Sequence, residues 1–111
     1  MPGATNVSES APAVALIRKV SENGGLVAAI CAAPAVVLAP HGFLKGKTAT
    51  CYPGFESKFG DATFREDRVV VDGNIITSRG PGTAGEFALA VVRALVDART
   101  ADKLQTATLS V

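Results

Sequence analysis

A single cysteine separates two apolar segments of this chain. Residues 26–39 read LVAAICAAPAVVLA, with Cys31 between LVAAI and AAPAVVLA. A short, continuously apolar segment bounded by glycine is typical of a strand buried in a parallel sheet. Pro34 lies near the start of the second segment, where the first turn of a helix accepts proline, so this segment predicts a helix. The chain therefore has to turn from a strand into a helix at Cys31, and this corner constrains the fold more than any other feature.

The rest of the chain continues the alternation of helices and strands. The first eight residues are polar and predict a loop, and apolar residues then recur at helical spacing over residues 14–20. The segment KTATCY, residues 47–52, predicts a strand. Asp72-Gly73 lies between two β-branched runs, which is a strong hairpin signal. The clearest helix is TAGEFALAVVRALVDA, residues 83–98.

The order of these elements predicts a fold class. Helix, strand, helix and strand are followed by a hairpin and a final helix, which is typical of an α/β fold with a mainly parallel sheet. Thr83 and Glu86 stand at the spacing of a capping box at the start of the last helix. We expect a single domain over residues 1–111. No strand is predicted before the first helix, so a sheet built from strand–helix–strand units lacks its leading strand here.

Composition argues against several functional classes. The chain is 48% apolar and 19% charged, as expected of a globular protein, and its net charge of +1 does not attract nucleic acid or anionic membranes. Cys31 and Cys51 form no CxxC pair and His41 is the single histidine, so a zinc site lacks ligands. No apolar run reaches the roughly 18 residues of a membrane span. We therefore expect a cytoplasmic protein with reduced thiols and no metal.

The position of Cys31 suggests a nucleophile. The thiolate is the reactive form of cysteine, and the free N–H groups at a helix N-terminus stabilise an anion. We therefore expect the pKa of Cys31 to fall below its ordinary value of about 8.5. The N–H of Ala32 is a candidate oxyanion donor. Free cysteine is also among the most buried residue types, so simple packing is the alternative that the spacing itself leaves open.

Several segments together resemble a known family. They are AAICAAPAVVLA, ATCYPGFE, DGNIITSRGPGTAGEFALAVVRAL and the opening MPGATNVSES. In the same order, from Met1 to about Leu95, they are similar to the ThiJ/PfpI superfamily, in the branch of the parkinsonism-associated protein deglycase (DJ-one). The resemblance implies a flavodoxin-like three-layer sandwich that forms a homodimer. It also implies a reactive, easily oxidised cysteine, which maps onto Cys31, and no cofactor.

The resemblance also implies an activity. Family members are glutathione-independent glyoxalases that convert methylglyoxal to lactate, or deglycases that act on glycated proteins and nucleotides, and redox sensing and chaperone action are further family roles. Tyr52 stands where the family often has a histidine. By resemblance, Tyr52, Arg79 and Pro81 are candidates for the substrate pocket. Cys51 is better interpreted as a packing cysteine than as a resolving thiol, and His41 as a cap at a helix end.

Two parts of the family site precede the point where the resemblance begins. The family has a glutamate that hydrogen-bonds the cysteine and a Pro-Gly-Gly turn that helps to form the oxyanion site. None of the ten carboxylates in this chain follows a predicted strand as such an acid would. The chain therefore resembles a family domain without its first strands and helices. One alternative is a catalytically inactive member that acts in redox sensing, as a chaperone or in dimerisation. Another is that Met1 is an internal methionine of a longer protein.

Overall fold

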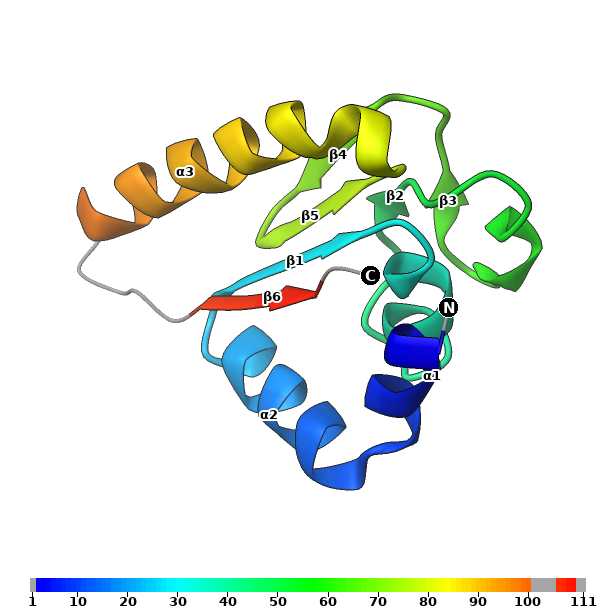
Figure 1. Ribbon diagram of the computed structural model, residues 1–111. Helices are drawn as coiled ribbons and strands as arrows, with labels where there is room; N and C mark the ends of the chain where they lie inside the picture. The colour runs from blue at the N-terminus through cyan, green and yellow to red at the C-terminus, as the bar shows by residue number, and fades with distance from the viewer. Residues whose placement is uncertain (1, 101–105, 110–111) are drawn as a thin grey trace.

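The computed structural model describes residues 2–100 and 106–109 of the chain. Its main sheet has four strands in the order β4-β5-β1-β6 (Figure 1). Strands β5 and β6 lie parallel to β1 on either side of it, and β4 lies antiparallel to β5. The four strands are β1 (Leu26–Ile30), β4 (Val69–Asp72), β5 (Ile75–Ser78) and β6 (Thr106–Leu109). β1 is therefore an interior strand, as its continuously apolar sequence predicts.

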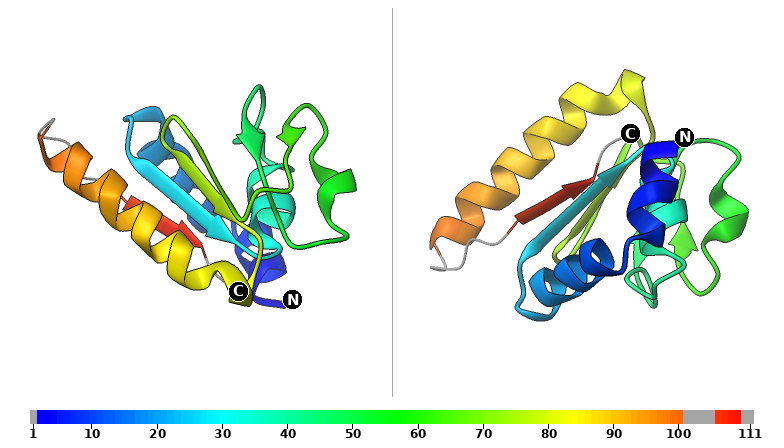
Figure 2. Two further views of the ribbon diagram at one scale, coloured as in Figure 1. Left: turned by 90° about the horizontal axis from the view of Figure 1, so that it is seen from above. Right: turned by 60° about the horizontal axis from the view of Figure 1, so that its bottom comes forward.

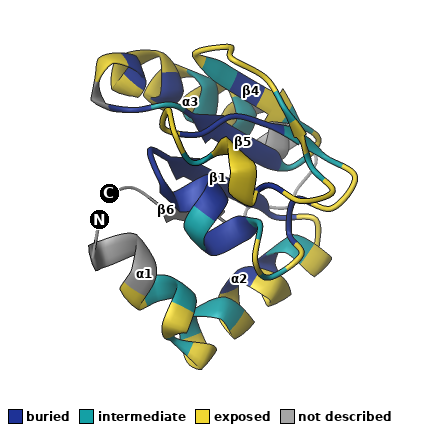
Figure 3. Ribbon diagram, turned by 90° about the vertical axis from the view of Figure 1, so that its right-hand side faces the viewer, coloured by how far each residue is buried: buried dark blue, intermediate teal, exposed yellow. Residues whose placement is uncertain are grey.

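Helices cover both faces of this sheet. Helix α3 (Ala84–Thr100) lies on one face, while α1 (Pro2–Glu9), α2 (Ala11–Glu22) and the short helix η1 (Pro34–Leu38) lie on the other (Figures 1 and 2). Alternate residues of β1 point to the two faces: Val27 and Ala29 belong to one core cluster, and Leu26, Ala28 and Ile30 to the other. All five are buried (Figure 3). The predicted three-layer α/β sandwich is confirmed.

Helix α2 begins and ends where its sequence indicates. The Ser10 hydroxyl caps it by accepting a hydrogen bond from the N–H of Ala13, and the chain leaves it through Gly24, whose φ is 76°. The predicted loop over the first eight residues is wrong, because Pro2–Glu9 forms α1. The mostly polar sequence of this helix gives no helical pattern of apolar residues, although Val7 packs against the core. No helix in the described part of the chain is long and apolar enough to span a membrane.

The predicted hairpin is confirmed between β4 and β5. Asp72 pairs with Ile75, so the two-residue turn is Gly73-Asn74, and Gly73 has a φ of 59°. The segment before it, which includes the 3-10 helix η2 (Glu56–Lys58), lies beside the main sheet (Figure 2).

The strand predicted over residues 47–52 is shorter than expected. Only β2 (Thr48–Ala49) is a strand, and it pairs with β3 (Thr63–Phe64) in a separate small sheet. Directly after β2, the N–H of Thr50 donates to the side-chain hydroxyl of Thr77 on β5 at 2.9 Å.

Candidate active site

Cys31 stands at a strained corner at the end of β1. Its φ is 64°, and it is the one non-glycine residue with a positive φ among those described. This left-handed conformation costs about 1–2 kcal/mol for a residue with a side chain. Two backbone hydrogen bonds hold the corner: the N–H of Cys31 donates to Ser78 O at 3.1 Å, and its carbonyl accepts from the N–H of Tyr52 at 2.7 Å. Strain that is fixed from both sides in this way is typical of functional positions.

The predicted helix after Cys31 is present but short. Pro34–Leu38 forms a single π-helical turn, in which Ala39 N donates to Pro34 O at 2.9 Å. The Ala32 carbonyl accepts hydrogen bonds from the N–H groups of Ala35 and Val36. The Ala32 N–H is directed at the Cys31 thiol, where it favours the thiolate and opposes a rise in its pKa. The role of Ala32 as an oxyanion donor stays a prediction.

The predicted fall in the pKa of Cys31 is wrong. Burial raises the pKa of this thiol above its ordinary value, and the hydrogen bond from the Ala32 N–H opposes that rise only in part. Cys31 is 3% exposed, and a helix of five residues has too small a dipole to offset the loss of hydration. No described carboxylate contacts the thiol.

The ring of Tyr52 and the thiol of Cys31 both lie next to Gly80. A Cβ atom added at Gly80 would lie 3.2 Å from Cδ1 of Tyr52 and 3.7 Å from Sγ of Cys31. The ring of Tyr52 contacts Phe55 edge-on, with 6.4 Å between centroids, and the residue is 39% exposed. The thiol, the tyrosine ring and the bare Cα of Gly80 therefore border one small space.

The loop that carries Gly80 is fixed by Thr83. The Thr83 hydroxyl oxygen accepts from the N–H of Gly80 at 3.1 Å, and it lies 2.8 Å from Gly80 O and 2.6 Å from the Ser78 hydroxyl. The predicted capping box is wrong, because Glu86 instead accepts from Nε of Arg68 at 2.7 Å. The sequence motifs did not predict the role of Ser78 and Thr83, although these two hydroxyl residues flank the RGPG turn and such residues often bond to nearby backbone groups.

The sequence places this site within a known family. It matches the DJ-1/PfpI family over residues 1–94. The chain belongs to this family. It is 50% identical to the Parkinson disease protein 7 homolog of Danio rerio over 107 residues, which are 93% of this chain and 56% of that protein. It is 38% identical to the glutathione-independent glyoxalase DJR-1.2 of Caenorhabditis elegans, with 85% of this chain and 50% of that protein covered.

Solved structures of the DJ-1/PfpI family share the fold. The oxidised DJ-1 of Toxoplasma gondii superimposes with a TM-score of 0.80 at 46% identity, covering 86% of this chain and 52% of that one. The chain therefore spans about half the length of these relatives.

Arg79, another candidate pocket residue of this DJ-1/PfpI chain, interacts with groups other than the thiol. Arg79 directs Nε to the carbonyl of Cys51 at 3.0 Å, and its guanidinium lies over the ring of Phe64 at 5.6 Å. Pro81 begins the 3-10 turn η3 (Pro81–Thr83), but its side chain lies outside the described part of the structure. Cys51 packs in the core, where burial and then the charge of Glu56 raise its pKa to about 11, against a smaller opposite effect of Arg79.

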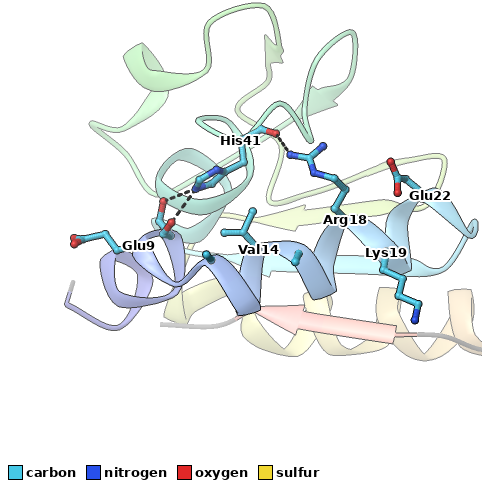
Figure 4. A pocket seen from close by; sticks show the side chains of 9 residues that line it. Glu9, Val14, Arg18, Lys19, Glu22 and His41 are labelled. Carbon is cyan, nitrogen blue, oxygen red and sulfur yellow. Dashed lines mark hydrogen bonds between the residues drawn. The ribbon is translucent and has the colours of Figure 1, made fainter.

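His41 serves a different part of the fold. Its Nε2 lies 2.9 Å from the carbonyl oxygen of Ser8 and 3.1 Å from the Ser8 hydroxyl, so it caps the end of α1 rather than its own segment (Figure 4). A cavity of about 480 Å³ lies beside it, lined mainly by the outer face of α2. The lining includes none of Cys31, Tyr52 and Gly80, so this cavity is separate from the thiol. Among the described residues, no three of His, Cys, Asp or Glu are grouped as metal ligands.

Proposed function

We propose that this chain carries the nucleophile of a cysteine-dependent glyoxalase or deglycase that acts on methylglyoxal or on glycated protein and nucleotide adducts. The observation that carries the proposal is the strained corner at Cys31, with the Ala32 N–H directed at the sulfur. The 38% identity to a glutathione-independent glyoxalase supports the same activity. The proposal includes a homodimer in the reducing cytoplasm, which suits two free cysteines.

The proposed reaction starts when Cys31 loses its proton and its sulfur attacks the aldehyde carbon of methylglyoxal. A carbon–sulfur bond forms, the carbonyl oxygen takes up a proton, and the product is a hemithioacetal. Moving the aldehyde hydrogen, as a proton, to the neighbouring carbon converts this adduct into a thioester. Water then hydrolyses the thioester to lactate and restores the thiol. The N–H of Ala32 stabilises the oxyanion formed by the first attack.

A second function is favoured by a specific observation. The thiol is buried, burial raises its pKa, and no described carboxylate is in contact with it to accept the proton. A chain in this state is suited to redox sensing, with chaperone action or dimerisation as the response, rather than to turnover. In that case slow oxidation of Cys31 is the signal.

Consumption of methylglyoxal separates the two functions. We expect the whole chain to consume methylglyoxal and form lactate, Cys31→Ser to lose this activity, and Cys51→Ser to keep it as the matched control. Activity that survives Cys31→Ser refutes the role of Cys31. If no form consumes methylglyoxal, the glyoxalase proposal fails. The sensor function is then supported if peroxide oxidises Cys31 in preference to Cys51, as measured by the masses of the two cysteine peptides.

A further inference from the structure

Burial of Cys31 conflicts with its role as a nucleophile. The residue is 3% exposed, yet a reactant has to reach its sulfur. On the side of Gly80, the space next to the thiol is bordered by the Tyr52 ring, because a Cβ atom at Gly80 would lie 3.2 Å from that ring and 3.7 Å from Sγ. Whatever enters this space must therefore fit between the tyrosine ring and the glycine or displace the ring.

The backbone of Tyr52 is anchored, but its ring is not. The N–H of Tyr52 donates to Cys31 O at 2.7 Å, and the preceding carbonyl, that of Cys51, accepts from Arg79 at 3.0 Å. The Tyr52 hydroxyl has no hydrogen-bond partner among the described residues, the ring contacts Phe55 edge-on, and the residue is 39% exposed. Rotation about the side-chain bonds of Tyr52 therefore opens and closes the approach without moving the main chain, and exposed side chains rotate in nanoseconds or less.

Gly80 is required for space rather than for its backbone conformation. Its φ lies outside the left-handed region, so any residue can adopt it. A Cβ here would be 3.2 Å from Cδ1 of Tyr52, closer than nearly all real contacts, and would occupy the space beside the sulfur. At Gly82, two residues further along the same loop, a Cβ would meet nothing within 4 Å. Gly82 therefore provides a matched control.

We infer that Tyr52 and Gly80 select reactants by size at Cys31: the tyrosine ring excludes bulky reactants, and the missing side chain of Gly80 leaves an opening for small ones such as two- and three-carbon aldehydes. This inference rests on the proposed reactivity of Cys31 but not on turnover. It makes Tyr52 a specificity-determining residue through the bulk of its ring, with no part for its hydroxyl.

Two thiol reagents of different size test the inference on the whole chain. Iodoacetamide is small: a carbon–sulfur bond forms, iodide leaves and the thiol proton goes to water. Dithiobis(nitrobenzoate) is bulky: a mixed disulfide forms and thionitrobenzoate leaves. The rate at Cys31 is read for each reagent by mass of the Cys31 peptide, which separates it from Cys51. The ratio of the two rates is the readout, because general unfolding raises both rates and moves the ratio toward its value in denaturant.

We expect Tyr52→Ala to raise the rate with the bulky reagent about tenfold and the rate with iodoacetamide far less. Tyr52→Phe should match the wild type with both reagents. Gly80→Ala should slow iodoacetamide several-fold, whereas Gly82→Ala should leave it unchanged. An unchanged ratio in Tyr52→Ala, or equal effects of Gly80→Ala and Gly82→Ala, overturns the inference. Loss of methylglyoxal turnover with the size dependence intact would instead overturn only the proposed function.

Discussion

The hydroxyl of Thr83 holds the loop beside Cys31, and Thr83→Val removes that hydroxyl while keeping the size of the side chain. The change deprives the buried N–H of Gly80 of its acceptor and the Ser78 hydroxyl of a partner at 2.6 Å. A lost hydrogen bond costs about 0.5–1.5 kcal/mol, and a buried donor left without a partner costs about 1–3 kcal/mol. The bond from the Thr83 N–H to Gly80 O, at 2.9 Å, survives the substitution. We therefore expect the free energy of unfolding to fall by about 2–4 kcal/mol.

Urea unfolding followed by circular dichroism measures this loss. Thr83→Val should lower the midpoint with little change in the slope, since the surface exposed on unfolding stays the same. Thr83→Ser keeps the hydroxyl and should recover most of the stability. If Thr83→Val lies within about 0.5 kcal/mol of the wild type, the level of an ordinary surface substitution, then the hydroxyl does not fix the loop as argued.

Two further predictions concern the core and the buried thiols. Leu38→Ala in η1, where the side chain is 0% exposed, should cost about 2–5 kcal/mol in the same urea assay. Leu89→Ala on α3, where the side chain is 59% exposed, should cost far less, and equal losses would contradict the assigned layers. Burial raises the pKa of Cys51 from 9.0 to about 11, so the folded state holds this proton more tightly than the unfolded state. The stability that this provides is complete below pH 9 and should be lost as the pH rises toward 11; Cys51→Ala should flatten that loss, and a profile identical to the wild type would refute it.

The features that the sequence predicts well depend on local patterns. The continuous apolar run of β1, the Asp-Gly hairpin and the glycine end of α2 each depend on neighbouring residues, and each is present. The corner at Cys31 follows from the same run, because a buried strand that meets a proline-initiated helix has to turn there. Tyr52 was found through the family resemblance and not through any pattern in the residues.

The features that it predicts wrongly depend on distant partners. Thr83 and Glu86 have the spacing of a capping box. However, the Thr83 hydroxyl accepts a hydrogen bond from the N–H of Gly80, and the Glu86 carboxylate accepts one from Nε of Arg68. The rise in the pKa of Cys31 comes from burial by later segments, which a local argument about a helix end cannot weigh. The space at Gly80 is likewise visible only once the loop has been placed against β1.

The order of residues along the chain has a consequence for synthesis on the ribosome. The residues beside Cys31 are made after it: Tyr52 is about 20 residues further on, and Ser78 and Gly80 nearly 50. Both strands that pair with β1 in the described part of the chain also follow it, so these contacts cannot form around the thiol until β5 has emerged. Each newly made molecule therefore passes through an interval in which the Cys31 thiol is open to solvent, before the residues that cover it in the folded chain have been made.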